Sequence, residues 1–478
     1  MLSSDLLILI TYIFFFVEGL AIIAAVHAIM RANTSQGAIA WAISLVTLPW
    51  ITLPLYAVFG RRKFNGYVLL RGSTDKAVKP RVEFLRRSAL ESGHEVQELT
   101  ASQQALVNLT ERPVLRHNKT ELLIDGEVTF ASIFNAMDSA RSYILVQFFI
   151  VEDDQLGNKF KARLIQKARE NVRIYFLYDE IGSHQLPKKY LQELRESGVD
   201  VIAFHTTKGR ANRFQLNFRN HRKIVVVDGE VAFVGGHNVG DEYVSRHSRL
   251  GEWRDTHVKI VGPVVKSVQF CFLEDWYWAK GEFPELDWKM QGAEGGNESS
   301  LLVTSGPADP MDTCGLMFTQ VINDACDRIW IASPYFVPDQ RVLGALKLAA
   351  LRGVDVRILI PQEADHRILY LASYAYYPEI LPAGIKVYRY LHGFLHQKVF
   401  LVDSSCAAVG TANLDNRSFR LNFELMLLNY SPSFISEVEK MLVQDLSKSR
   451  MAVLEDYTTR SFPFRLAVRS SALLSPVL

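Results

Sequence analysis

Two short stretches of the chain place the same residue types at the same spacing. They read "NHRKIVVVDGEVAFVGGHN" (220–238) and "LHQKVFLVDSSCAAVGTAN" (395–413). Counted from the histidine, both have lysine at +2, aspartate at +7, glycine at +14 and asparagine at +17. The two sets are His221, Lys223, Asp228, Gly235 and Asn238, then His396, Lys398, Asp403, Gly410 and Asn413. For residue types present at a few per cent each, two such matches arise by chance in well below about one chain in a thousand. We therefore expect one shared function.

The β-branched run after each histidine predicts a strand, in which side chains two residues apart share a face. An imidazole and an ammonium on one face form an anion site. A single His-x-Lys pair would be read as an ordinary solvated face, and only the repetition argues against that. Asp228 and Gly229 indicate a hairpin turn that returns Gly235 and Asn238 beside the histidine. Asp228 and its counterpart in the second copy then lie at turns, so we assign them to the scaffold although they belong to the motif.

The elements that carry these motifs follow a strand–helix–strand pattern in each half of the chain. Buried-strand patterns at 143–153 and 172–182 flank a helical one, and the same order recurs at 328–339, 340–354 and 356–364. The two histidines are 175 positions apart and similar strand starts are 184 apart, which is typical of a duplicated domain with small insertions. We predict an α/β protein of two duplicated α/β/α domains.

The N-terminal region differs from the rest. Leu6 to Met30 contains one acidic residue and Gly37 to Gly60 contains no charge, so the pair predicts a transmembrane helical hairpin. A cleaved signal peptide is the competing interpretation, but it lacks a basic start and a second apolar run follows at once. The basic cluster at 60–64 predicts that the remainder lies in the cytoplasm.

Composition limits the function classes. With a formal net charge of +2, the chain shows no global preference for nucleic acid. The four cysteines have no metal-like spacing, which favours reduced thiols in a cytosolic compartment.

The paired "HRKIVVVD" and "HQKVFLVD" resemble the two HxKxxxxD motifs of the phospholipase D superfamily. The runs "FRNHRKIVVVDG", "GEWRDTHVKIVGPVV" and "GTANLDNRSFRLNFE", together with the N-terminal hairpin, are similar to bacterial cardiolipin synthases. The resemblance implies two phospholipase D-like domains with mixed sheets facing each other. It also implies metal-free transfer through a phosphohistidine without a cofactor, phosphatidylglycerol as substrate and cardiolipin as product. It further implies a multi-pass protein of the bacterial inner membrane, with the bilayer as partner and possible homo-oligomerisation.

The resemblance also implies roles for single residues. Lysines 223 and 398 would hold the nonbridging phosphate oxygens, with Asn238, Asn413 and Thr411 as hydrogen-bond donors. Asp255 and Glu424 would orient the histidines, a rim salt bridge being the alternative. We expect His221 to be the nucleophile because Arg219 and Arg222 would keep it neutral, and His396 to be the general acid and then the base.

The expected boundaries are a hairpin at 1–64, a juxtamembrane linker at 65–118, a first domain at 119–285, a connector at 286–300 and a second domain with tail at 301–478. Rival functions are a phospholipase D-type hydrolase, another phosphatidyltransferase, a superfamily nuclease and a non-enzymatic lipid-binding protein.

Overall fold

The computed structural model describes residues 4–31, 35–60, 80–204, 217–246 and 250–478. It divides into two compact units, with helices α1–α3 in one and every labelled strand in the other. The basic residues 61–64 and the first part of the predicted linker, 65–79, lie outside the described residues.

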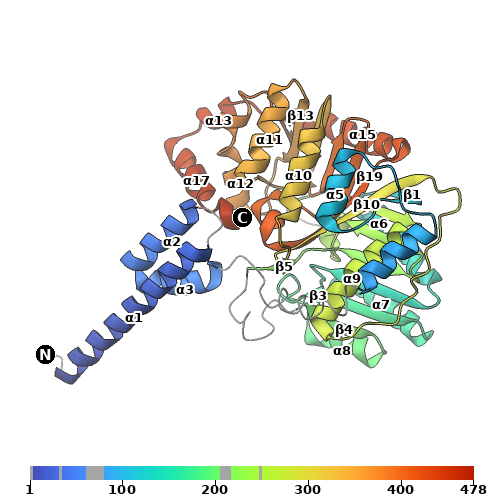
Figure 1. Cartoon of the computed structure of the whole chain (residues 1–478), viewed down its shortest axis with the longest axis horizontal. Helices are drawn as coiled ribbons and strands as arrows, with labels where there is room; N and C mark the ends of the chain where they lie inside the picture. Colours follow the sequence, from blue (N-terminus) through green and yellow to red (C-terminus); the bar gives the residue numbers. More distant parts are fainter. Residues whose placement is uncertain (1–3, 32–34, 61–79, 205–216, 247–249) are drawn as a thin grey trace. The chain divides into compact units, whose positions relative to one another are not determined.

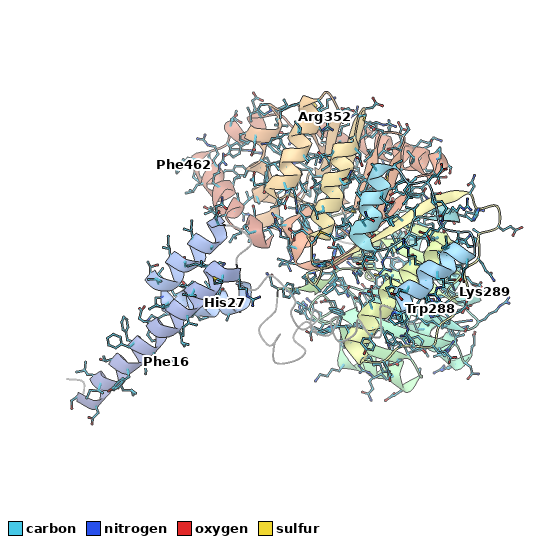
Figure 2. The ribbon with its side chains drawn as sticks, in the orientation of Figure 1. Phe16, His27, Trp288, Lys289, Arg352 and Phe462 are labelled. Atoms are coloured by element: carbon cyan, nitrogen blue, oxygen red, sulfur yellow. The ribbon has the colours of Figure 1, made fainter. Side chains whose placement is uncertain are left out.

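The N-terminal unit has one helix, α1 (Ser4–Arg31), that is long and apolar enough to cross a membrane. It is the only such helix among the described residues. Its side chains point outward along most of its length, as Phe16 illustrates (Figure 2).

The second apolar run differs from the expected single helix. It forms α2 (Ser35–Thr47) and α3 (Pro49–Phe59), which are separated at Leu48. The residue before a proline disfavours the helical conformation, so Pro49 ends one helix and starts the next. Neither piece reaches the about 20 residues that a span needs. Multi-pass topology therefore stays a prediction.

The first described helices of the second unit are one at 80–91 and α5 (Ala101–Thr110). The first half then contains β1 (Leu115–Ile124), α6 (Asp125–Ser139), β2 (Tyr143–Phe148), α7 (Gln155–Arg169), β3 (Arg173–Asp179), α8 (Lys188–Glu196), β4 (Asp200–Phe204), β5 (Arg219–Asn220), β6 (Ile224–Val227), β7 (Val231–Gly235), η1 (Asp241–Val244), β8 (Trp253–Arg254), β9 (Thr256–Val261) and α9 (Val264–Lys280).

The second half repeats this order. It contains β10 (Glu298–Ser305), α10 (Thr313–Asp324), β11 (Arg328–Ala332), β12 (Phe336–Val337), α11 (Gln340–Leu351), β13 (Asp355–Pro361), α12 (Arg367–Tyr374), α13 (Tyr377–Ile380), β14 (Lys386–Tyr390), β15 (Phe394–Leu395), β16 (Val399–Val402), β17 (Cys406–Gly410), β18 (Leu414–Asp415), α14 (Asn416–Arg420), β19 (Asn422–Asn429), α15 (Pro432–Ser447), β20 (Ser449–Met451), α16 (Glu455–Thr458), α17 (Phe462–Ala472) and η2 (Ser475–Val477).

Each half builds a mixed sheet. In the first half, β2, β3 and β4 are parallel, and β6, β7 and β9 continue antiparallel from β2. In the second half, β11, β13 and β14 are parallel, and β16, β17 and β19 continue from β11 in the same way. Each half also has its own hydrophobic core between sheet and helices. The predicted α/β class and the duplication are confirmed.

The two sheets are joined into one through the antiparallel pair β1–β10 (Figure 1). Glu298 on β10 stabilises this joint, because its buried carboxylate accepts from the Thr120 backbone amide at 3.0 Å and from Asn429 Nδ2 at 2.8 Å. Two short parallel pairs also cross between the halves, β5 with β19 and β8 with β15. These crossing pairs bring the motif histidines to the other half.

Candidate active site

Both motifs form the expected hairpins. The first consists of β6 and β7 and the second of β16 and β17, and each histidine precedes its hairpin. All four motif side chains, His221, Lys223, His396 and Lys398, are buried. An aromatic ring packs near each imidazole, with centroids 5.1 Å apart for Phe149 and His221.

The carboxylates that contact the histidines come from the opposite halves. His221 Nδ1 lies 3.0 Å from Glu424 Oε2, and His396 Nδ1 lies 2.7 Å from Asp255 Oδ2. The backbone repeats the arrangement, because the His221 amide donates to the carbonyl of Phe423 and the His396 amide to that of Arg254. Each histidine thus binds the backbone one residue before its carboxylate. One composite site results, and neither half is complete alone.

Glu424 is saturated with donors. Oε2 also accepts from the Thr411 hydroxyl at 2.5 Å, while Oε1 accepts from the Ser418 hydroxyl at 2.9 Å and from Asn422 Nδ2 at 3.1 Å. Burial alone would raise the pKa of Glu424, but His221 and its hydrogen bond outweigh burial and lower it. The carboxylate is therefore ionised and held in one position.

Both imidazoles are neutral at pH 7. Burial lowers the pKa of His221 to about 4, with Lys223 and Lys398 acting in the same direction against Glu424. Burial and the same two lysines lower the pKa of His396 well below its ordinary value. A neutral imidazole that donates from Nδ1 to a carboxylate keeps the lone pair of Nε2 available for attack.

The expected cause of this neutrality is wrong. The guanidinium of Arg222 points away to the buried carboxylate of Asp275, with both oxygens at 2.9 Å. Burial is the largest cause of the lowered pKa at both His221 and His396, and Lys223 and Lys398 add to it. Neither Arg219 nor Arg222 is among the main causes. Charged neighbours therefore do not identify the nucleophile.

The two motif lysines are positioned to bind an anion. Lys223 Nζ donates to the carbonyl of its own motif histidine at 2.6 Å, and Lys398 makes the equivalent contact. Burial lowers the pKa of Lys223 well below its ordinary value and that of Lys398 to about 8. Two partly desolvated ammonium groups form a strong site for a phosphodiester.

The motif aspartates lie at turns away from the histidines. Asp228 accepts from the backbone amides of residues 141–143 at 2.7–2.8 Å. Asp403 accepts from those of residues 326–328 at 2.7–3.0 Å. Both have a positive φ, 53° and 48°. Their contacts tie each motif hairpin to the start of the first parallel strand.

The asparagines differ from one another. Asn238 Nδ2 donates to the Tyr243 hydroxyl at 2.7 Å. Asn413 hydrogen-bonds Asp415 through its side chain, while its buried Oδ1 has no hydrogen-bond partner in the part of the chain that the structure describes. Thr411 faces Glu424, so its contact is to the orienting carboxylate.

The motif glycines permit close strand contact. A Cβ on Gly235 would lie 2.5 Å from the carbonyl oxygen of Thr256, and one on Gly410 would lie 2.2 Å from that of Leu425. A Cβ on Gly236 would lie 2.0 Å from Asp255 Oδ1. The small residues therefore allow β19, which contains Glu424, and β9, which begins directly after Asp255, to approach the hairpins.

Sequence reasoning missed several buried side chains that hold the catalytic segments in place. Asp275 and Asp445, on the equivalent helices α9 and α15, accept from the residues that follow the two histidines, Arg222 and Gln397. His237 is a further buried group, and its Nδ1 lies 3.0 Å from that of His257. No shared spacing could have revealed these contacts. Among the described residues, no group of three or more His, Cys, Asp or Glu side chains could hold a metal ion.

Comparisons with known proteins agree on one family. Residues 133–251 and 318–446 match the model of the cardiolipin synthase, PLD-like domain family, and residues 19–61 match a phospholipase D-nuclease N-terminal family. Cardiolipin synthase A of Pseudomonas fluorescens (strain SBW25) is 48% identical over 98% of this chain and 98% of its own length. Cardiolipin synthase A of Pseudomonas aeruginosa (strain LESB58) is 48% identical over 97% of this chain and 95% of its own.

Among solved structures, phosphatidylserine synthase of Haemophilus influenzae Rd KW20 aligns with a TM-score of 0.59 at 15% identity. The alignment covers 80% of this chain and all of that one. At this identity the likeness concerns the fold alone.

Proposed function

Because the chain belongs to the cardiolipin synthase family with phospholipase D-like domains, we propose that it transfers a phosphatidyl group from one phosphatidylglycerol to another and releases glycerol. The observation that carries the proposal is the crossed pairing, in which each half supplies one histidine and the carboxylate that orients the other. Two oriented imidazoles at one phosphate divide the work of nucleophile and proton carrier.

In the first step, Nε2 of His221 attacks phosphorus and the bond from phosphorus to the glycerol oxygen breaks. His396 is neutral in the free enzyme, but the negative charge of the bound phosphodiester raises its pKa, so that it takes up a proton from water in the substrate complex. It gives this proton to the glycerol oxygen, and glycerol leaves. In the second step, His396 takes the proton of a hydroxyl on a second phosphatidylglycerol. That oxygen attacks phosphorus, the bond to the His221 nitrogen breaks, and cardiolipin is released.

The charges on the site suit both steps. Lys223 and Lys398 hold the nonbridging oxygens as negative charge develops, and Asn238 and Asn413 complete the cradle. The proton on Nδ1 of His221 stays on that nitrogen and is donated in a hydrogen bond to Glu424, whose negative charge stabilises the phosphorylated ring. Two acceptors, Glu424 Oε2 at 3.0 Å and the Thr411 carbonyl at 3.2 Å, hold this ring. Such a fixed ring suits the nucleophile, which must carry the intermediate between two substrates.

The lipid substrate and α1 place the enzyme at a membrane. We assign it to the bacterial inner membrane as a multi-pass protein with its catalytic unit in the cytoplasm, where the basic residues after the apolar runs would face anionic lipid. A site entered from the bilayer holds the acceptor lipid at high local concentration, which favours transfer over hydrolysis.

The decisive experiment incubates the purified full chain with phosphatidylglycerol vesicles and identifies the products by mass spectrometry. We expect cardiolipin and glycerol in equal amounts. Phosphatidic acid without cardiolipin would instead identify a phospholipase D-type hydrolase. A protein that binds the vesicles without turnover would be a non-enzymatic lipid-binding protein.

A further inference from the structure

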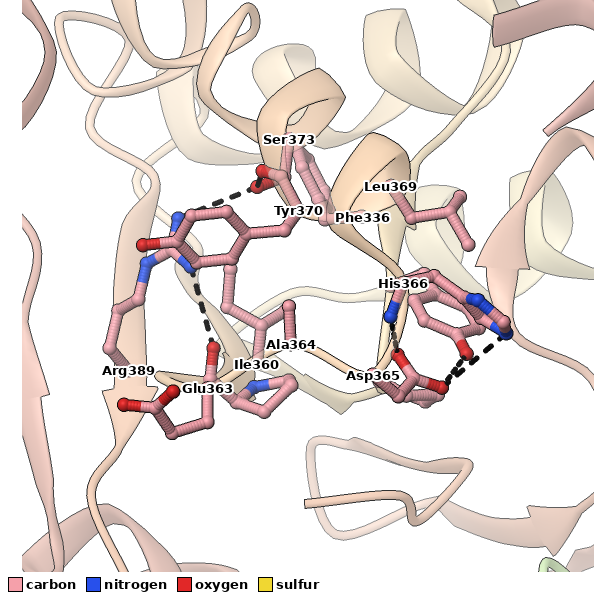
Figure 3. A pocket seen from close by; sticks show the side chains of 13 residues that line it. Phe336, Ile360, Glu363, Ala364, Asp365, His366, Leu369, Tyr370, Ser373 and Arg389 are labelled. Carbon is pink, nitrogen blue, oxygen red and sulfur yellow. Dashed lines mark hydrogen bonds and ion pairs between the residues drawn. The ribbon is translucent and has the colours of Figure 1, made fainter. Parts of the chain in front are cut away.

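A narrow pocket lies beside the second motif, where the parallel strands β11, β13 and β14 end (Figure 3). It contains about 280 Å³ of empty space, part of which is open to solvent. One wall is the segment 334–336, whose Phe336 pairs with Leu414, the residue after Asn413. The carboxyl ends of parallel strands are the usual place for ligands in α/β sheets. The pocket is therefore next to the catalytic centre.

The inner end of the pocket is Arg389, which is only 1% exposed. Its guanidinium donates to the Tyr377 hydroxyl at 2.8 Å and makes two long contacts of 3.4 Å, to the Pro361 carbonyl and the Ser373 hydroxyl. No carboxylate in the described ranges forms an ion pair with it. These three bonds use three of its five N–H groups, so Arg389 offers further donors to a ligand.

The opposite wall, toward the catalytic centre, supplies acceptors. Asp365 accepts from the Tyr335 hydroxyl and from the backbone amide of His366, whereas Glu363 of the same loop lies on the Arg389 side of the pocket (Figure 3). Burial lowers the pKa of Lys398, and the charge of Asp365 is close enough to that lysine to oppose part of the lowering. A carboxylate has about four lone-pair sites, so Asp365 can accept from a ligand as well.

We propose that this pocket binds the glycerol headgroup of the lipid and selects for it. The inference rests on the proposed function and deepens it by locating headgroup recognition. A diol both donates and accepts, so its hydroxyls match the Asp365 carboxylate on one wall and the Arg389 N–H groups on the other. An ammonium headgroup only donates, which would leave Arg389 facing another cation. The pocket therefore favours glycerol over ethanolamine.

The same pocket serves leaving and entering alcohols. An alcohol that attacks the phosphohistidine must reach phosphorus from the position that glycerol leaves, because the exchange reaction is the reverse of glycerol release. Free glycerol added to the enzyme should thus occupy the pocket and exchange into the lipid. Propan-1-ol has one primary hydroxyl that can attack phosphorus and no further hydroxyl for the pocket to bind. Its rate of transfer therefore measures attack on the phosphohistidine without headgroup recognition.

The test is a competition. The full chain is incubated with phosphatidylglycerol vesicles and equal concentrations of deuterated glycerol and propan-1-ol, and the ratio of labelled phosphatidylglycerol to phosphatidylpropanol is measured by mass spectrometry. Both alcohols attack the same intermediate, so losses of activity or folding cancel in the ratio. We expect a wild-type ratio far above the factor of two that glycerol's two primary hydroxyls give. Asp365→Asn and Arg389→Gln should each reduce it by about tenfold or more, as expected for hydrogen bonds to charged groups.

The matched control is Arg450→Gln, since Arg450 lies directly opposite Arg389 on β20 but pairs with Asp456 outside the pocket. Its ratio should equal that of the wild type. A wild-type ratio near two, or pocket variants that keep the wild-type ratio, would overturn the proposal. If Arg389→Gln does not fold, Asp365→Asn on its surface loop decides. Cardiolipin is measured in the same mixture. If no cardiolipin forms but the alcohol ratio is as expected, the proposed synthase activity is wrong and the proposed glycerol site is supported.

Discussion

Asp255→Asn and Glu424→Gln both replace a buried carboxylate oxygen with an amide nitrogen, but their surroundings predict different losses. Asp255 Oδ2 contacts His396 at 2.7 Å and Oδ1 accepts from the Thr256 backbone amide at 2.8 Å. An asparagine NH₂ that faced this backbone amide would leave two donors opposed, at a cost of about 1–3 kcal/mol. The asparagine therefore turns its NH₂ toward His396, whose Nδ1 must then accept. This imidazole adopts the wrong tautomer, which lowers kcat on the order of 10⁴-fold in a Ser-His-Asp triad.

Glu424 has adaptable partners. Glutamine can direct its NH₂ toward Ser418 and Asn422, because a hydroxyl can rotate and the Asn422 Oδ1 has no hydrogen-bond partner among the described residues. The Nδ1 of His221 then still donates to an oxygen, so the imidazole keeps its tautomer. Only the negative charge of that acceptor is lost. The difference between a charged and a neutral acceptor is about 1–1.5 kcal/mol, so we expect about a tenfold loss for Glu424→Gln.

The assay compares cardiolipin formation with the burst of p-nitrophenol from a phosphatidyl-p-nitrophenol donor. This leaving group needs no general acid, so the burst should survive in His396→Ala and be absent in His221→Ala. Asp255→Asn should share the behaviour of His396→Ala, with cardiolipin formation lost and the burst retained. Glu424→Gln should slow both reactions by the same factor.

If Glu424→Gln behaves like His396→Ala, each carboxylate serves the histidine of its own half, and the crossed pairing is refuted. Equal losses at the two carboxylates would refute the tautomer argument. Glu121→Gln, a change on the exposed side of β1 where Glu121 pairs with Lys259, is the matched control and should leave both assays unchanged.

Three further predictions concern the same site. After incubation with phosphatidylglycerol, His396→Ala should retain some lipid covalently bound to His221 in intact-protein mass spectra, and label on His396 in the His221→Ala protein would reverse the assignment. Burial lowers the pKa of Lys398 to about 8, so its ammonium is charged only below that pH. We therefore expect kcat/KM to fall as the pH rises through about 8. Lys398→Arg should shift this fall in kcat/KM to higher pH, even if the variant is slower at every pH. Gly410→Ala should lower the free energy of unfolding by about 1–3 kcal/mol or more, because its Cβ meets backbone, whereas Gly344→Ala in α11, with nothing within 4 Å, should raise it by about 0.5–1 kcal/mol; denaturant unfolding that ranks them otherwise would contradict the packing argument.

Several features of the protein follow from its sequence because they are local. The spacing from histidine to lysine and on to the turn describes a hairpin of about twenty residues, and both hairpins form as expected. The strand–helix–strand order and its repetition predicted the duplicated α/β fold, and the family resemblance is confirmed by the relatives. The break at Leu48 was also readable from Pro49, although the length of the apolar run favoured one helix.

Other features required the tertiary structure. His221 and Glu424 are 203 positions apart, and His396 and Asp255 are 141 apart. Sequence reasoning named all four, but could not say which carboxylate serves which histidine, because the pairing depends on the strands β5 and β8 docking on the opposite half. Spacing within one half contains no information about that contact.

The charged groups that act on the pKa of His221 also required the tertiary structure. Arg222 adjoins His221 in the chain, so sequence proximity made it a candidate for lowering the histidine pKa. Successive residues of an extended segment point in opposite directions, and the fold directs the guanidinium to Asp275. Sequence thus determined which groups meet at the site, through residue types and local periodicity. Tertiary structure decided their partners, burial and protonation, because these depend on contacts between segments far apart in the chain.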